Sequence, residues 1–327
     1  MTENRVSVLV TFYNQEKYVD TALQSVFSQK TDFGVKVIVG DDGSSDRTCE
    51  IVNQWIERYP DNIELHIMER GEGKQIPGFR ASRNRLNLLQ YVDTDYFNFL
   101  DGDDYFTCDT KLQRQVEILD LADNSDCIAC GHNVYRSYSD GRNIPATDPN
   151  LKEGKVSPEY FWSKAYIHTD SLMFRSSFIP EIKVKLLENS FNDTMITLSA
   201  VQHGMIYYIP EIWAIYLQTA DGIWTSGNAV VNHVRSIIFY DLATKVNPKL
   251  KMHTICRFGY VWKGLFKLRK SIDPSSLTAY YNEAKDKGCK NAILWISYPD
   301  LNPFQKIGLL VKTFFIRCSI PVIKHII

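Results

Sequence analysis

Short apolar stretches alternate with longer amphipathic ones over the first hundred residues of the chain. The short stretches are rich in β-branched and aromatic residues and predict strands at Val6–Val10, Val35–Val39, Ile63–Met68 and Tyr96–Leu100. The longer stretches repeat apolar side chains at helical spacing and predict helices at Glu16–Gln29, Asp46–Tyr59 and Phe79–Tyr91. This alternation is typical of an α/β domain with a mainly parallel sheet.

The pattern becomes mixed after residue 125. Strands are predicted within residues 127–135, 171–175 and 205–210, and a helix within 190–204 that Gly204 closes. Antiparallel elements are therefore expected in this part. Beyond residue 228 the pattern is mostly helical. We expect one domain over 1–228, with one half at about 1–105 and another at about 106–228, followed by a helical extension over 229–327.

Polar loops follow three of the predicted strands: "TFYNQ" the first, "GDDGSSD" the second and "DGDD" the fourth. Parallel strands place these loops on one edge of the sheet, where α/β proteins bind ligands. By itself "DGDD" is either a solvated turn or a binding site for a divalent cation. Asp42 likewise is either a turn residue or an acceptor for a nucleobase or ribose, whereas Asp46 is expected to cap the next helix.

Charge and cysteine content exclude several function classes. The 37 basic and 38 acidic residues nearly cancel, so the chain as a whole does not favour nucleic acid. Seven cysteines, an odd number, do not suggest a disulfide framework, and the N-terminus lacks signal-peptide features, so we expect a cytoplasmic setting. Cys127, Cys130 and His132 resemble half a zinc site, but without a second pair the cysteines are expected to be buried thiols.

Four motifs occur in a characteristic order and at characteristic intervals: "VSVLVTFYNQEKYVDTALQSVFSQ", "VIVGDDGSSDRT", "ASRNRLN" and "FLDGDD". Together they resemble the inverting family 2 glycosyltransferases. The resemblance covers roughly the first 225 residues, and it is the combination of motifs that is specific. It implies a GT-A-like, mainly parallel sheet flanked by helices, here with a helical C-terminal extension.

The resemblance also implies a site for a nucleotide-sugar and a metal. Asp101 and Asp103 of the D-x-D motif are expected to bind Mn²⁺ or Mg²⁺, with Asp103 the more direct ligand. Thr11 and Asp42 resemble the residues that contact uracil. The other residues expected at the nucleotide-sugar are Tyr13, Arg83, Asn84, Gly102 and Trp224. Arg83 suits a bidentate phosphate contact, whereas Arg80 and Arg85 are expected to be solvated.

Asp193 resembles the catalytic base of the family, which deprotonates the acceptor hydroxyl. The alternative is an acidic residue that only compensates the dipole of a helix. In the loop that follows, Gln218 stands where relatives often carry a basic residue or His. His168 and Asp170 are expected on the floor of the acceptor site.

We therefore expect an inverting, metal-dependent transfer of a sugar from a UDP-sugar to a hydroxyl of a growing glycan or a lipid-linked acceptor, in bacterial-type surface polysaccharide synthesis. The alternative is a nucleotide-sugar-binding protein without transferase activity. A binder needs Asp42 and Asp103 but not Asp193.

The last segment, residues 304–327, is apolar but interrupted by basic residues, so it does not predict a transmembrane span. Lys306, Arg317 and Lys324 fall close to one face at helical spacing. Two interpretations remain open. The segment either lies on the anionic inner face of the cytoplasmic membrane, as a peripheral contact, or packs on the domain with its lysines in water.

Overall fold

A computed structural model of the 327-residue chain describes residues 3–70, 77–188, 193–219, 229–309 and 311. Strands and helices alternate in its first part as the pattern predicts: β1 Asn4–Phe12, α1 Val19–Phe27, β2 Gly34–Asp41, α2 Thr48–Arg58, β3 Ile63–Ile67, α3 Pro77–Leu88 and β4 Tyr96–Asp101. Helix α1 begins three residues later than predicted. The reason is that the Glu16 N–H donates to the Asp46 carboxylate at 3.0 Å, outside any helix. Asp46 also accepts from the Thr48 N–H at the start of α2, at 3.0 Å.

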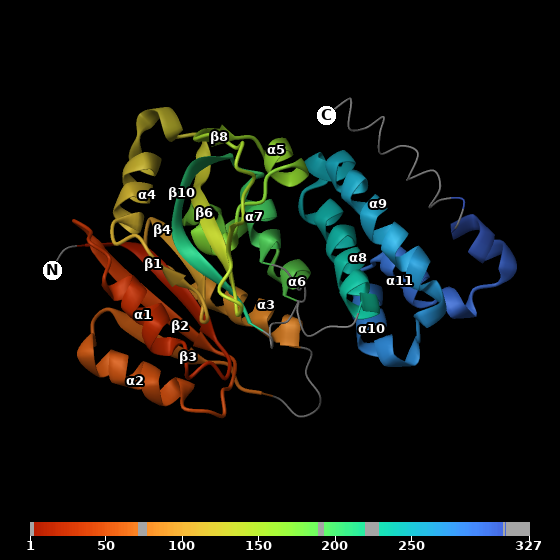
Figure 1. The fold of residues 1–327 in the computed structure, drawn as a ribbon, viewed down its shortest axis with the longest axis horizontal. Helices are drawn as coiled ribbons and strands as arrows, with labels where there is room; N and C mark the ends of the chain where they lie inside the picture. Colours follow the sequence, from red (N-terminus) through yellow and green to blue (C-terminus); the bar gives the residue numbers. More distant parts are fainter. Residues whose placement is uncertain (1–2, 71–76, 189–192, 220–228, 310, 312–327) are drawn as a thin grey trace.

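One mixed sheet forms the centre of the molecule, in the order β3-β2-β1-β4-β9-β6-β10-β5 (Figure 1). Its later strands are β5 Tyr105–Phe106, β6 Cys127–Tyr138, β7 Asn143–Pro145, β8 Gly154–Val156, β9 Met173–Arg175 and β10 Met205–Gln218. Strands β3, β2, β1 and β4 are parallel. Strand β9 runs antiparallel to both β4 and β6, which confirms the expected antiparallel elements. The GT-A-like α/β fold is thus confirmed.

The register of the parallel strands brings the predicted polar loops together. Thr11 on β1 pairs with Asp101 on β4, and Phe12 pairs with Asp41 on β2. The carboxyl ends of these three strands therefore lie side by side at one edge of the sheet.

Further helices flank the sheet: α4 Lys111–Asp120, α5 Pro158–Ser163, α6 Val184–Leu187 and α7 Thr194–Ala200. Helix α7 lies within the range predicted as helical, part of which is outside the described residues. Residue 204, between α7 and β10, must be glycine, because a Cβ there would lie 2.4 Å from the Asp126 carbonyl oxygen. Cys127 and Cys130 are buried on β6, as expected.

The C-terminal part is helical, as predicted, with α8 Ala229–Val246, α9 Lys251–Leu268, α10 Thr278–Asp286 and α11 Lys290–Ile296. These helices gather at one end of the molecule, beyond α6 and α7 (Figure 1). They belong to the same hydrophobic cluster as Phe79 of α3 and Trp162 of α5. The Trp162 Nε1–H donates to Thr254 Oγ1 of α9 at 2.8 Å. The predicted domain boundary at residue 228 adjoins residues 220–228, which are outside the described residues.

Candidate active site

A cavity of about 770 Å³ opens at the edge of the sheet where β1, β2 and β4 end. Among the described residues predicted to bind donor or metal or to act as base, all except Arg83 line it: Thr11, Tyr13, Asp42, Asn84, Asp101, Gly102, Asp103 and Asp193. Arg83 is half-buried on α3 and is not part of the lining. Trp224 lies outside the described residues.

Asp42 is fixed by two arginines at one end of the cavity. Its side chain is 4% exposed and forms ion pairs with Arg80 and, at 3.2 Å, with Arg70. Arg70 also stacks over the Tyr13 ring, 3.8 Å from its centroid. Burial raises the pKa of Asp42, and the two arginines offset part of that effect. The expectation that Arg80 is solvated is wrong, because α3 directs it toward the sheet edge, where it also donates to the Met68 carbonyl at 3.1 Å.

Asn84 fixes α3 against the sheet. Its Nδ2 donates to the Gly40 carbonyl of β2 at 2.9 Å. A Cβ at position 40 would lie 2.4 Å from Asn84 Oδ1, so only glycine allows this approach. Asn84 thereby sets how close α3 and its arginines come to the carboxyl ends of the strands.

The D-x-D turn forms the acidic wall of the cavity. The Arg85 guanidinium binds both carboxylate oxygens of Asp101, at 2.5 and 2.7 Å. Arg85 is only 15% exposed, so the expectation that it is solvated is also wrong. Burial, with a contribution from the Asp101 charge, raises the pKa of Asp103 to about 6. Gly102 is required between them, since a Cβ there would lie 2.2 Å from Phe12 Cδ1.

Asp193 lines the same cavity at the start of α7. Its carboxylate accepts from the Thr194 N–H at 2.9 Å, so it also caps the helix. Burial by itself would raise the pKa of Asp193, but Arg85 and His168 nearby bring it below its ordinary value. The carboxylate is therefore ionised at neutral pH and able to accept a proton.

Part of the cavity lining is aromatic, and the sequence did not predict it. It includes Phe161 and Trp162 of α5, Tyr166, and Phe239 and Tyr240 of α8. The sequence pattern places α8 in the helical extension and therefore does not predict that its side chains reach the cavity. The run "EYFWSKAY" before His168 was the one local signal, because it is dense in aromatic residues.

Residues 7–182 match the family model "Glycosyl transferase family 2". The chain belongs to this family. Its curated relatives include the uncharacterized protein Mb1547 of Mycobacterium bovis, 28% identical over 222 residues, which are 68% of this chain and 61% of that protein. They also include the processive diacylglycerol beta-glycosyltransferase of Mycoplasma pneumoniae, 28% identical over 204 residues, which are 55% of this chain and 57% of that protein. The chain thus spans about three fifths of the length of these relatives.

Solved structures of similar fold hold nucleotide-sugars. Residues 1–349 of Staphylococcus aureus TarS in complex with UDP-GlcNAc align with a TM-score of 0.52 and 16% identity, covering 90% of this chain and 92% of that one. The mannosyltransferase PcManGT of Pyrobaculum calidifontis, in complex with GDP-Man and Mn²⁺, aligns with a TM-score of 0.54 and 14% identity, covering 97% and 87%. At these identities the likeness shows the fold.

Proposed function

We propose that this glycosyltransferase transfers a sugar from a UDP-sugar to a hydroxyl group with inversion at the anomeric carbon. The observation that carries the proposal is that the D-x-D turn and Asp193 face one cavity, with Asp42 at its end. In this arrangement the D-x-D turn serves the departing diphosphate, Asp193 serves the attacking hydroxyl and Asp42 serves the nucleobase.

The residues of the D-x-D turn fit a divalent cation. Asp103 offers carboxylate oxygens at the cavity wall beside Asp101, and hard ions such as Mn²⁺ and Mg²⁺ prefer oxygen ligands. When bound, such an ion stabilises the negative charge that develops on a departing diphosphate. Arg85 holds Asp101 in place, and its guanidinium adds positive charge to the same wall.

Asp193 is the proposed base, because its ionised carboxylate lines the same cavity as the metal-binding turn. A base on the acceptor side deprotonates the hydroxyl as it attacks the anomeric carbon from the face opposite the leaving group, which inverts the configuration. Arg85 and His168 keep Asp193 ionised, and Thr194 fixes its orientation.

Asp42 supports a uridine donor. A carboxylate held by Arg80 and Arg70 is oriented to accept the imide N–H of uracil, and the Tyr13 ring beside Arg70 provides an apolar surface for a base. TarS is similar in fold and was solved with UDP-GlcNAc, while PcManGT was solved with GDP-Man. GDP-sugars are therefore the competing class of donor, and the experiment must include GDP.

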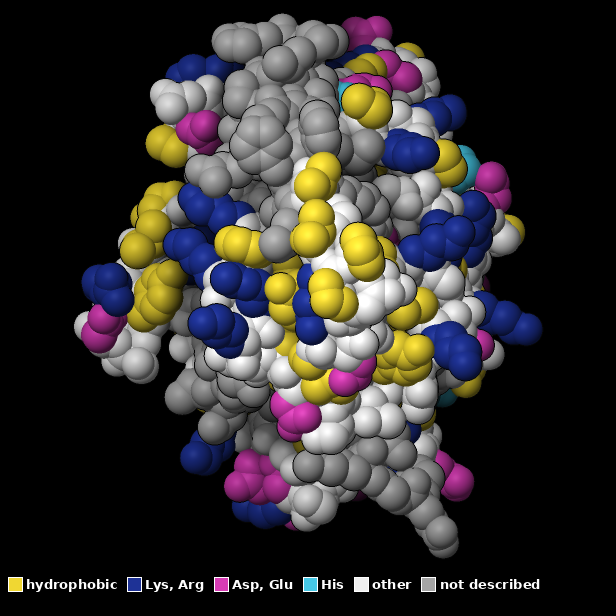
Figure 2. Space-filling model, turned by 90° about the vertical axis from the view of Figure 1, so that its right-hand side faces the viewer, with side chains coloured by type: hydrophobic (Ala, Val, Ile, Leu, Met, Phe, Trp, Pro, Cys, Tyr) yellow, Lys and Arg dark blue, Asp and Glu magenta, His cyan; other side chains and the backbone are white. Residues whose placement is uncertain are grey.

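The proposed acceptor is a growing glycan or a lipid-linked sugar of surface polysaccharide synthesis, at the inner face of a membrane. Phe304, Ile307 and Val311 expose apolar side chains, with Phe304 86% exposed. Exposed lysines on α9, Lys263 and Lys267, lie at helical spacing. Figure 2 shows hydrophobic side chains among many Lys and Arg side chains on this end of the molecule. Within the described part of the chain, no helix is long and apolar enough to cross a membrane.

Calorimetry with metal-stripped protein tests the donor site. UDP should give little heat without metal and normal binding once Mn²⁺ is added, and GDP should bind more weakly. Asp103→Asn should abolish the effect of Mn²⁺. Equal UDP affinity with and without metal would remove the proposed role of Asp103. Metal-dependent binding without any sugar transfer would instead favour the alternative, a nucleotide-sugar-binding protein.

A further inference from the structure

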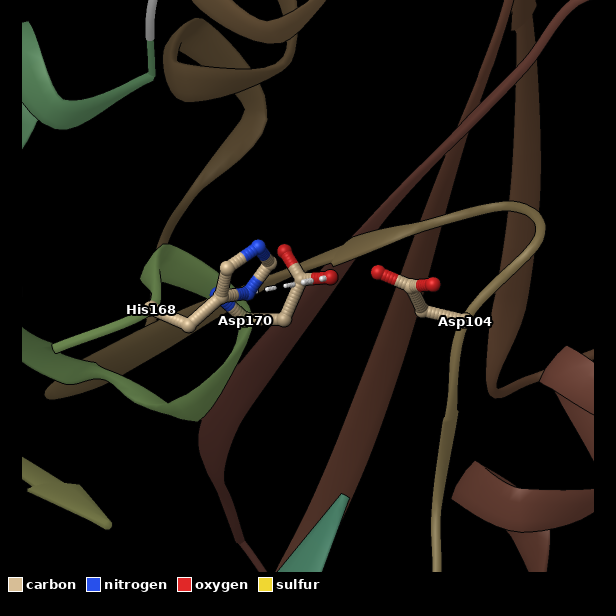
Figure 3. A group of neighbouring side chains, drawn as sticks. All are labelled: Asp104, His168 and Asp170. Carbon is tan, nitrogen blue, oxygen red and sulfur yellow. Dashed lines mark hydrogen bonds and ion pairs between the residues drawn. The ribbon is translucent and has the colours of Figure 1, made fainter. Parts of the chain in front are cut away.

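Three buried side chains converge behind the acidic wall of the cavity: Asp104, His168 and Asp170 (Figure 3). Asp104 directly follows the D-x-D motif, His168 precedes the 3-10 turn η3 Thr169–Ser171, and Asp170 lies within that turn. Their exposed fractions are 1%, 6% and 3%. One ligand atom from each lies within 4.8 Å of the others. Asp104 and Asp170 do not line the cavity, unlike Asp103, whereas His168 does, so the cluster lies behind the cavity wall and reaches the cavity through His168.

One carboxylate oxygen of Asp104 has no hydrogen-bond donor among the described residues. Asp104 Oδ1 accepts from the Leu217 N–H of β10 at 2.8 Å. Its Oδ2 is buried and, among the described residues, has no hydrogen-bond donor. Figure 3 shows the Asp104 carboxylate directed at Asp170. Among the described residues, the Asp170 carboxylate is 3.8 Å from His168 Nδ1 and accepts a long contact, 3.4 Å, from the Asp101 N–H. His168 Nδ1 also accepts a long contact, 3.4 Å, from the Asp170 backbone N–H.

Neighbouring Lys and Arg side chains act on Asp170 only at longer range, without direct contact. No Lys or Arg of the described part of the chain forms an ion pair with Asp104 or Asp170. Arg85 is bound to Asp101, and the Lys111 ammonium is held by Asn98 Oδ1 and Gln115 Oε1 at 2.5 and 2.9 Å. Two facing buried carboxylates need either a proton or a cation between them.

We infer that Asp104, His168 and Asp170 bind a divalent transition-metal ion of the Zn²⁺ class. Two carboxylate oxygens and one imidazole nitrogen form a mixed donor set that suits Zn²⁺ and Co²⁺ better than Mg²⁺. His168 also lines the cavity, so a water molecule there can complete the coordination. The ion would link the D-x-D turn to η3. Because the Leu217 N–H of β10 donates to Asp104, β10 would be linked to the same site. The inference concerns metal binding alone and does not depend on sugar transfer.

The test is metal titration of the full chain without nucleotide, in an Asp103→Asn background that removes the donor-site ion. We expect one Zn²⁺ or Co²⁺ per chain by elemental analysis, and visible absorption from bound Co²⁺. Asp170→Asn and His168→Gln, added singly, should weaken binding at least about tenfold. Asp140→Asn, an exposed aspartate elsewhere, should change nothing. Circular dichroism checks that each variant is folded. If Asp170→Asn does not fold, the metal affinity of His168→Gln alone tests the inference.

The competing occupant is a proton shared by Asp104 and Asp170. In that case the Asp103→Asn protein takes up neither Zn²⁺ nor Co²⁺, and that result overturns the inference. Binding that Asp170→Asn and His168→Gln leave unchanged overturns it as well. UDP binding with Mn²⁺ in the otherwise wild-type chain is measured in parallel, so failure of the proposed donor site is recognised separately.

Discussion

Arg85 connects the acidic residues of the cavity at the level of single side chains. It binds both oxygens of Asp101, and its charge also acts on Asp193. Without Arg85, the negative charges of three carboxylates in the cavity lining, those of Asp101, Asp103 and Asp193, would be less well compensated. The chemistry proposed for these carboxylates therefore depends on an arginine that contacts one of them directly.

Replacing the proposed base tests this arrangement. Asp193→Asn should retain UDP binding and lower the turnover number by about 10² to 10⁴, the usual contribution of general base catalysis. The measurement is steady-state turnover with donor binding by calorimetry. Asp126→Asn, an exposed aspartate, is the control. A variant of near-normal turnover would assign the base to another residue.

The raised pKa of Asp103 predicts a pH dependence of metal-linked binding. Its carboxyl has a pKa of about 6, so it is increasingly protonated below that pH and loses its ability to bind a cation. The affinity for UDP with Mn²⁺ should be constant near pH 7 and fall by up to about tenfold per pH unit below pH 6. In the metal-stripped protein the folded carboxyl keeps a proton that the unfolded chain has released, so the contribution of Asp103 to the free energy of unfolding falls as the pH rises from about 4 to about 6 and is level above that.

Titration of UDP at a series of pH values, with Mn²⁺ and without, provides the measurement. Asp103→Asn should bind weakly at every pH. A wild-type affinity that does not change between about pH 5 and pH 7 would contradict the assignment of Asp103 as the metal ligand.

The sequence predicted which loops meet but not how α3 faces them. The positions of Thr11, Asp42 and Asp101 follow from strand ends, which hydrophobic periodicity locates well. Arg80 and Arg85 were expected in solvent because their partners, Asp42 and Asp101, come from other strands. No local pattern reports such long-range pairs. The convergence of Asp104 with His168 and Asp170 likewise depends on β9 pairing with β4, which no local motif indicates.

The D-x-D turn is the element whose packing most limits substitution. Gly102→Ala would place a methyl group 2.2 Å from Phe12 Cδ1, so either the turn or the aromatic ring must move. We expect a loss of about 1–3 kcal/mol in the free energy of unfolding, with weaker metal-dependent UDP binding. Denaturant unfolding measures the first. Gly308→Ala is the matched control, because among the described residues no atom beyond its chain neighbours and its own helix backbone lies within 4 Å of the added Cβ. Equal stability of the two variants would mean that the turn is not tightly packed.

The C-terminal helices act with the rest of the molecule, because they share its hydrophobic cluster and α8 forms part of the cavity wall. The exposed Phe304 and Ile307 are the described residues that suit contact with a membrane surface. Each lysine near an anionic surface contributes about 1 kcal/mol. The protein should therefore sediment with anionic vesicles, and less so at high salt, where charges are screened over shorter distances.

A vesicle experiment distinguishes this attachment from non-specific hydrophobic adsorption. Phe304→Ser combined with Ile307→Ser should lower the fraction bound to anionic vesicles, whereas Leu121→Ser, an exposed leucine after α4, should not. Absence of binding by the unaltered chain would indicate that these helices only pack on the domain and that the acceptor is soluble.

The central claim is metal-dependent sugar transfer in the cavity that Asp103 and Asp193 line. The most direct test is release of UDP or GDP from a panel of UDP- and GDP-sugars, with Mn²⁺ and with chelator, by the wild type and Asp103→Asn. We predict release from at least one UDP-sugar that requires Mn²⁺ and is lost in Asp103→Asn. Release that persists with chelator, or that Asp103→Asn retains, would contradict the account.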